Sequence, residues 1–358
     1  MTINHPALAP IATPALVVDE PVLRANIAAM AAFARDRDIA LRPHVKTHKS
    51  SLIARMQMEA GARGVACATV AEAEMMIAGG LRDVLVTSPV AEPGKVRRLA
   101  TLAREAKFTV VVDHPTHVAL LAAADAPFDV LIDVDLGQRR TGVAEIEAGV
   151  ALAKRITGSL RLTGLQGFGG HIQHMVDAGE RRAAAHAASD HLDALRRAIE
   201  AEGLRCDVVS GSGTGAYAYD ASGAYTELQV GSYLFMDADY RRLAWEKNLP
   251  FQQSLFVLAT VVSANRPGQV TVDAGVKALA FNGPPPDILL GVPEGARYQF
   301  AGDEHGVIIL PDRAEPPKIG ARILIGATHC DPTVNLHAAF HLLSPEGVKR
   351  VPLEGRYA

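Results

Sequence analysis

The sequence predicts an α/β protein: a closed (β/α)8 barrel with a second, smaller, mostly β C-terminal domain. Two observations support this prediction. Short apolar runs alternate with alanine-rich helical segments over about 230 residues, as in a parallel sheet that is covered on both faces. After Trp245 the long helical segments stop, and strand-like runs separated by Pro and Gly turns follow. We therefore expect a barrel over residues 15–245 and a β-rich domain over residues 246–358, with which residues 1–14 could pack.

The first helix has the clearest sequence signals. Asp19 can cap its N-terminus, Pro21 suits its first turn, and apolar residues recur at helical spacing up to Asp38. Further helices are expected at residues 51–60, 70–79, 145–156 and 178–202.

The barrel strands are expected between these helices, as short apolar runs. They lie at residues 39–43, 64–68, 83–86, 108–112, 128–133, 162–168 and 208–211. Seven or eight such units favour a closed barrel over an open sheet. In the β-rich domain, strands are expected at residues 251–263, 269–272, 306–310 and 321–325, while the apolar run 13–19 could join either domain.

Composition excludes several classes of function. The chain has 358 residues, of which 49% are hydrophobic, so a sizeable core can form. The net charge is only −3, with no long run of one sign, which argues against a nucleic-acid partner. Cys67, Cys206 and Cys330 fit neither a disulfide framework nor a zinc spacing, and indicate buried thiols in a reducing compartment. Because neither a signal peptide nor a bilayer-spanning run is seen, we expect a cytoplasmic protein with no membrane partner.

The segment Pro-His-Val-Lys-Thr-His-Lys, residues 43–49, places Lys46 between two histidines at an expected strand end. Burial and neighbouring cations both favour the neutral amine, which is the form that makes a Schiff base. A solvated basic loop is the alternative interpretation. Active sites of barrel enzymes gather at the carboxyl ends of the strands, and Lys46 follows such an end.

Two further loops after expected strands carry polar side chains. Residues 133–143 contain two aspartates, two glycines and an arginine pair, which suits a ligand-binding loop or a capped turn equally well. Residues 164–174 contain four glycines, which allow close approach of a ligand, and the histidines His171 and His174. On a helical turn these histidines would share one face, and either could act as a general base near neutral pH.

Two small-residue segments could bind a phosphate group. Residues 210–215 read Ser-Gly-Ser-Gly-Thr-Gly, and residues 228–233 read Leu-Gln-Val-Gly-Ser-Tyr. Backbone N–H groups in such a loop can bind phosphate. Because the first segment is neither a Walker nor a Rossmann motif, a phosphate on something other than a nucleotide fits better.

A late segment, residues 326–337, pairs an imidazole with a carboxylate. If the chain is extended here, His329 and Asp331 point one way and Cys330 points the other. The pair could share a divalent metal and leave positions open for water and substrate, and Cys330 would be a poor ligand. A polar strand edge is the alternative.

These segments, in this order, closely resemble the D-threonine aldolase and D-serine dehydratase family of pyridoxal-phosphate enzymes, which have the alanine-racemase-like fold. The resemblance covers residues 13 to 345, and the lysine and metal segments are its most specific parts. It implies a (β/α)8 barrel that carries pyridoxal 5'-phosphate, a β domain at its mouth, and a homodimer. Lys46 matches the Schiff-base lysine, and Arg140 matches an arginine near the cofactor ring oxygen. The remaining matches are Gly213, Thr214, Gly231, Ser232 and Tyr233 to the phosphate cradle, His174 to the base, and His329 with Asp331 to the metal pair.

Two positions bear on the reaction. The dehydratase branch resembles His-x-Cys at the metal, whereas this chain has His-x-Asp, as in the aldolase branch. A nitrogen and oxygen pair favours Mn²⁺ or Mg²⁺, with Co²⁺ and Zn²⁺ still possible. The family often has tyrosine where this chain has Phe168, which could alter ring contacts or substrate preference.

The resemblance therefore implies a D-threonine-type aldolase, a carbon–carbon lyase that cleaves small D-3-hydroxy amino acids to glycine and an aldehyde. Dehydratase or aldolase activity on D-serine or 3-hydroxy-D-aspartate is the alternative within the family. Two other readings are a pyridoxal-phosphate-binding protein without turnover, and a barrel metallohydrolase that uses the histidines without pyridoxal.

Overall fold

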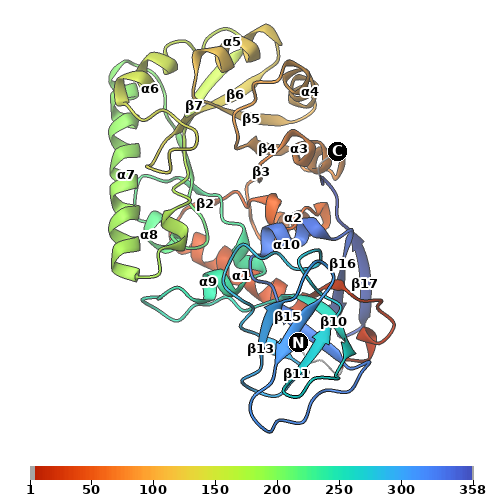
Figure 1. The fold of residues 1–358 in the computed structure, drawn as a ribbon. Helices are drawn as coiled ribbons and strands as arrows, with labels where there is room; N and C mark the ends of the chain where they lie inside the picture. Colours follow the sequence, from red (N-terminus) through yellow and green to blue (C-terminus); the bar gives the residue numbers. More distant parts are fainter. Residues whose placement is uncertain (1–4, 357–358) are drawn as a thin grey trace. The chain divides into compact units, whose positions relative to one another are not determined.

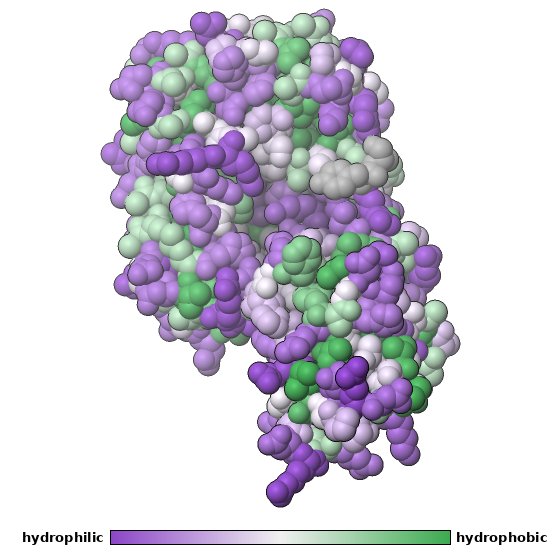
Figure 2. Space-filling view, in the orientation of Figure 1, coloured by the Kyte–Doolittle hydropathy of each residue, from purple (hydrophilic) through white to green (hydrophobic). Residues whose placement is uncertain are grey.

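The computed structural model describes residues 5–356, which form two compact units (Figure 1). The barrel unit comprises residues 30–231, 243–246 and 354–356. The β-rich unit comprises residues 5–29, 232–242 and 247–353. The division differs from the expected boundary, because residues 15–29 and 232–242 lie in the β-rich unit. Charged and polar residues cover most of the visible surface, with apolar residues scattered among them (Figure 2).

The barrel unit is built on a closed parallel sheet. Its strand order within the described chain is β2-β9-β8-β7-β6-β5-β4-β3, so each strand lies beside its neighbours in sequence. The end strands also meet, since the N–H of Ala66 donates to the carbonyl of Pro43 (2.9 Å) and His44 bridges Ala66 in parallel. The predicted (β/α)8 barrel is thus confirmed. The strands are β2 (Ala40–Leu41), β3 (Val65–Cys67), β4 (Asp83–Val86), β5 (Lys107–Val112), β6 (Phe128–Val134), β7 (Leu160–Gly167), β8 (Val208–Gly211) and β9 (Glu227–Leu228).

Helices cover the outer side of this sheet, with α7 the long green helix in Figure 1. Their starts follow local chemistry: the side chains of Ser50, Thr69 and Asp177 accept N–H groups at the first turns of α2, α3 and α7. Prolines begin α4 and α5, where their missing N–H costs nothing. The helices of the barrel unit are α2 (Ser51–Glu59), α3 (Val70–Ala78), α4 (Pro93–Ala103), α5 (Pro115–Ala123), α6 (Ile146–Ala153), α7 (Ala178–Ala201) and α8 (Tyr217–Asp220), with short 3₁₀ turns η2 (Val45–Thr47) and η3 (Ile172–His174). The helix α1 (Glu20–Arg35) begins in the β-rich unit and ends in the barrel unit.

The apolar run 13–19 belongs to the β-rich unit. It forms β1 (Ala15–Asp19), which is buried throughout and pairs antiparallel with β10 (Leu255–Ser263) and parallel with β16 (Ala339–Ser344). Within this unit, β1 is therefore hydrogen-bonded to a neighbouring strand along each edge and buried on both faces. The sheet order is β13-β14-β11-β10-β1-β16-β17, and β15 joins β10 to β12. The other elements are β11 (Gln269–Val272), β12 (Leu289–Leu290), β13 (Arg297–Phe300), β14 (Gly306–Ile309), β15 (Arg322–Gly326), β17 (Gly347–Pro352), α9 (Ala238–Arg241), α10 (Cys330–Leu336), η1 (Pro6–Leu8) and η4 (Ser232–Leu234).

One expectation about local structure is wrong. The segment after His329 is not extended but forms the helix α10, which begins at Cys330. Pro332 suits a first helical turn, and Asp331 is favourable near a helix N-terminus. The three side chains still differ in burial, because Cys330 is fully buried and the residues on either side of it are half-buried.

In the described part of the chain, no helix combines the length and the apolar character that a bilayer crossing needs. The described cysteines, Cys67, Cys206 and Cys330, are all buried and free, as expected.

Candidate active site

Lys46 lies in the turn η2, directly after β2 at the carboxyl end of the barrel sheet. The turn is set by His44, whose side chain accepts the backbone N–H of Lys46 (3.4 Å). The amine Nζ lies 6.0 Å from the centroid of the Phe168 ring, which follows β7. Lys46 therefore faces residues that also come from strand ends, as expected for a barrel active site.

Lys49, three residues further on, has a different environment. Its Nζ forms a buried ion pair with Glu72 Oε1 (2.9 Å) and donates to the carbonyl of Gly355 (3.1 Å). Both partners of this pair are almost inaccessible to solvent. The structure thus separates the two lysines of the motif: Lys49 is committed to a structural ion pair, and Lys46 remains the candidate for cofactor attachment.

Arg140 joins this group through the same aromatic ring. Its guanidinium carbon lies 5.8 Å from the Phe168 centroid, close to the distance of the Lys46 amine. Both distances are within the range of cation–π attraction. The structure therefore brings together Lys46, Arg140 and Phe168, although Lys46 lies 94 residues before Arg140 and 122 residues before Phe168 in the sequence. Phe168 supplies a ring face and no hydroxyl at this position.

Asp133, near the end of β6, is a buried carboxylate beside this group. It accepts hydrogen bonds from Gln166 Nε2 (2.8 Å) and from the hydroxyl of Thr141 (2.7 Å). Burial raises the pKa of Asp133 to about 6, although Gln166, Thr141 and Arg140 favour the charged form. The folded state thus holds a proton on Asp133 at a pH where the unfolded chain has released it.

We expect Asp133→Asn to stabilise the protein above pH 6. Because the folded pKa exceeds the unfolded one, the native state binds more protons between pH about 4 and 6, and stability falls as pH rises through this window. The amide cannot ionise, so the variant should gain on the order of 2–3 kcal/mol above pH 6 and nothing below pH 4. Urea unfolding across this range measures the difference. Asp135→Asn, in the same loop but half-buried, is the control; a gain independent of pH would contradict the assignment.

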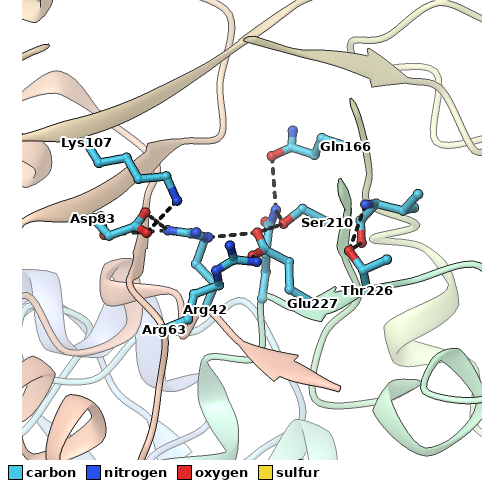
Figure 3. A network of polar contacts seen from close by, with 10 residues as sticks. Arg42, Arg63, Asp83, Lys107, Gln166, Ser210, Thr226 and Glu227 are labelled. Atoms are coloured by element: carbon cyan, nitrogen blue, oxygen red, sulfur yellow. Dashed lines mark hydrogen bonds and ion pairs between the residues drawn. The ribbon is translucent and has the colours of Figure 1, made fainter. Parts of the chain in front are cut away.

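A chain of polar contacts leads from Arg42 to Gln166 (Figure 3), and the hydrogen bond from Gln166 continues it to Asp133. Arg42 donates to Asp83, at the start of β4, and to Glu227 (2.7 Å each). The hydroxyl of Ser210 donates to Glu227 (2.6 Å), and Gln229 donates to Ser210 (2.8 Å) and to Gln166 (3.2 Å). The sequence analysis did not predict that these residues form one hydrogen-bonded network. The pattern that could have indicated it is a polar residue in or next to each of several apolar strands.

The loop after β8 has the backbone of an anion site. A Cβ on Gly215 would lie 2.1 Å from the Gln173 carbonyl oxygen, so only glycine fits there, and a Cβ on Gly213 would lie 2.7 Å from Oε1 of the Gln173 side chain. Gln173 also accepts the N–H of Ala216 (3.1 Å) and thereby shapes the loop. Within residues 5–356, the N–H groups of Gly213 and Gly215 donate to no acceptor of the chain, and a phosphate could accept them.

The second glycine segment is split between the units. Gly231 belongs to the barrel unit, where an added Cβ would lie 2.5 Å from Thr47 Oγ1, a buried hydroxyl with no hydrogen-bond partner among the described residues. Ser232 and Tyr233 begin η4 in the β-rich unit and are both buried. Within the barrel unit, the close approach of Gly231 to Thr47, the residue after Lys46, and the N–H groups of Gly213 and Gly215, which are unpaired among the described residues, suit the phosphate of a bound cofactor.

The two histidines after β7 differ in environment. His174 ends η3 and is half-buried, with its Nδ1 inaccessible to solvent. His171 is exposed, and its ring lies near the position that a Cβ on Gly137 would occupy (3.7 Å). The two side chains are therefore not equivalent, and His174 is the more enclosed candidate base.

The expected metal pair lies in the β-rich unit, at the start of α10. His329 is the residue before the helix, and its Nδ1 lies 3.2 Å from the amide nitrogen of Asn282. Asp331 lies in the first helical turn. Among residues 5–356, no group of three or more His, Cys, Asp or Glu side chains is arranged so that it could hold a metal ion. The nitrogen and oxygen donors fit a hard divalent ion.

A cavity of about 320 Å³ lies elsewhere, at the amino ends of the barrel strands. Its lining includes Lys107, Asp129, Arg161 and Val208, each of which is the first or second residue of its strand. Because barrel active sites form at the opposite ends of the strands, we do not assign this cavity to the site.

Comparison with known proteins identifies the family. A model described as the alanine racemase N-terminal domain matches residues 18–239, and one described as a putative serine dehydratase domain matches residues 254–343. A D-threonine aldolase of an Arthrobacter species is 42% identical over 92% of this chain and 88% of its own length. The chain belongs to the D-threonine aldolase and D-serine dehydratase family. As a family member it is a carbon–carbon lyase of the aldolase type that depends on pyridoxal phosphate.

Two further members of the family support this assignment. A 3-hydroxy-D-aspartate aldolase of Paracoccus denitrificans is 38% identical over 91% of this chain and 87% of its own length. The crystal structure of a D-threonine aldolase from Filomicrobium marinum superposes with a TM-score of 0.91 at 38% identity and covers 98% of this chain and 96% of that one. The family that the sequence motifs predict is therefore confirmed.

Proposed function

We propose that this aldolase cleaves D-threonine-type 3-hydroxy amino acids and uses a divalent metal, Mn²⁺ or Mg²⁺ in preference to Co²⁺ or Zn²⁺. The proposal rests mainly on the pair His329 and Asp331. Asp331 offers a carboxylate two residues after the imidazole of His329, while the thiol of the intervening Cys330 is fully buried. An oxygen ligand favours a hard ion that can polarise a hydroxyl.

The residues of the chain have separate tasks in this proposal. Lys46 attaches the cofactor, and Arg140 lies near the ring. Gly213, Thr214, Gly231, Ser232 and Tyr233 bind the phosphate. Pyridoxal phosphate supplies the electron sink that Cα–Cβ cleavage needs. A metal on His329 and Asp331 would act as a Lewis acid on the substrate hydroxyl. His174 accepts the hydroxyl proton as the general base.

Dehydration of D-serine or 3-hydroxy-D-aspartate is the second candidate, because the same residues could serve it. The difference is positioning: cleavage starts with loss of the hydroxyl proton, whereas dehydration starts with loss of the Cα proton. Because one relative is a 3-hydroxy-D-aspartate aldolase, 3-hydroxy-D-aspartate is included among the substrates in the product analysis below. A homodimer and a cytoplasmic location are also proposed, and light scattering of the purified protein tests the first.

Product analysis tests the proposed reaction. The holoenzyme is incubated with D-threonine, D-allothreonine, D-serine and 3-hydroxy-D-aspartate. We expect glycine and an aldehyde from the threonine isomers, and little ammonia or 2-oxo acid from any substrate. Predominant ammonia and 2-oxo acid would instead establish the dehydratase.

Metal removal tests the second half of the proposal. Exhaustive chelation should remove most of the activity, since the hydroxyl then lacks its Lewis acid, and Mn²⁺ should restore it. The cofactor absorbance serves as the control and should not change. Full activity after chelation, with metal content verified as zero, would exclude the metal role.

A further inference from the structure

Asp237 is a buried carboxylate that the proposed chemistry does not use. It lies between η4 and α9 in the β-rich unit, with 0% of its surface exposed. Its two oxygens have different partners. Oδ1 accepts the N–H of Tyr240 (3.0 Å) and caps α9, while Oδ2 accepts the N–H of Cys330 (2.8 Å), 93 residues further along the chain. The first contact is local, and the second ties α9 to the expected metal segment.

The hydrogen bond from Cys330 to Asp237 lies between the two expected metal ligands and can orient both of them. This N–H belongs to the peptide group that joins His329 to Cys330, and Asp331 follows directly. Holding that peptide group fixes the backbone directions from which the His329 and Asp331 side chains leave. Adjacent backbone bonds extend the attachment: Ala238 N–H donates to the Ala327 carbonyl (3.0 Å), and Asp239 N–H donates to the Thr328 carbonyl (3.3 Å).

Neutral groups hold the same segment from a second side. The Thr333 hydroxyl donates to the His329 carbonyl (2.7 Å) and accepts the N–H of Ala280 (3.2 Å). Asn282 contacts the His329 ring at Nδ1 (3.2 Å). The imidazole is thus restrained at Nδ1 and at its backbone, and Asp237 lies close enough to His329 for an electrostatic interaction.

We propose that Asp237 is a positioning residue, which orients His329 and Asp331 for metal binding by fixing the peptide group between them. This inference rests on the proposed metal-dependent function. A carboxylate is needed because two N–H donors approach two separate oxygens. Asparagine offers one acceptor oxygen and turns its NH₂ group toward the other donor. Loss of such an outer contact typically weakens metal binding about 10–100-fold.

The test measures Mn²⁺ affinity of the folded holoenzyme directly, by electron paramagnetic resonance of free Mn²⁺ during titration. Asp237→Asn should raise the Kd for Mn²⁺ about 10–100-fold. The cofactor absorbance should not change, and saturating Mn²⁺ should recover activity. A second variant, Asp237→Ser, keeps a helix-capping hydroxyl for Tyr240 but is too short to reach Cys330. It should weaken Mn²⁺ binding in the same way, so the test does not depend on the folding of one variant.

Asp273→Asn is the matched control. This carboxylate also accepts a backbone N–H, from Thr260 (2.7 Å), and a hydroxyl, from Thr13 (2.6 Å), in the same unit. The variant should therefore lose stability without losing Mn²⁺ affinity. Wild-type affinity in both folded Asp237 variants overturns the inference and leaves the proposed function standing. If His329→Ala binds Mn²⁺ with the same affinity as the wild type, the proposed metal site and the inference both fail.

Discussion

Replacement of Lys46 by alanine should lower kcat by at least about 10³-fold, the scale seen when a residue of the covalent step is removed. The physical reason is the loss of the amine that attaches the cofactor, since the neighbouring Lys49 is tied to Glu72 and Gly355. Borohydride reduction of the wild-type holoenzyme followed by peptide mass spectrometry should locate the pyridoxyl group on Lys46. The variant should lose both the label and the visible absorbance of the attached cofactor.

Lys49 supplies the matched control, because it lies in the same heptapeptide. Lys49→Ala should keep the label on Lys46 and lower stability instead, by about 3–5 kcal/mol, since it leaves the Glu72 carboxylate buried and without its ion-pair partner. A pyridoxyl group found on Lys49, or a labelled Lys46→Ala variant, would contradict the assignment.

Replacement of His174 by alanine should lower kcat by about 10²–10⁴-fold, the usual contribution of a general base. The cofactor should remain attached, because Lys46 lies on a different strand end, and its absorbance should match the wild type. Steady-state kinetics with D-threonine and an absorbance spectrum of the same sample measure both quantities.

His171→Ala is the control for this experiment. His171 belongs to the same loop but is exposed, so its loss should change kcat little. Wild-type turnover in His174→Ala would rule out His174 as the base. An equal loss in both variants would indicate disruption of the loop rather than removal of a base.

Much of the barrel could be predicted from the sequence, because its strands are buried on both faces and its helices have local start signals. The run 83–86 is the strand β4, and the expected helix 178–202 is α7 to within one residue. The two-residue strand β9 was missed, since Glu227 and Leu228 carry no periodic pattern. The helix α10 was mistaken for extended chain, because the alternation of His329 and Asp331 was given more weight than Pro332, which suits a first helical turn.

The candidate residues show the same limit. Lys46, Arg140 and His174 could be chosen from motifs, because reactive groups at expected strand ends stand out in an apolar chain. Phe168 was noticed only as a departure from the family. Asp237 follows three apolar residues without any motif, and the partner that gives it significance lies 93 residues away.

The sequence by itself determined the alternating barrel pattern, the β-rich second part and the family, because each is written in local spacing and residue type. Only the tertiary structure decided that Lys49 pairs with Glu72, that one ring lies near both Lys46 and Arg140, and that Asp237 accepts the N–H of Cys330. Such contacts join residues from different elements, and their existence depends on how strands and helices pack in three dimensions. Local patterns carry no record of those distances.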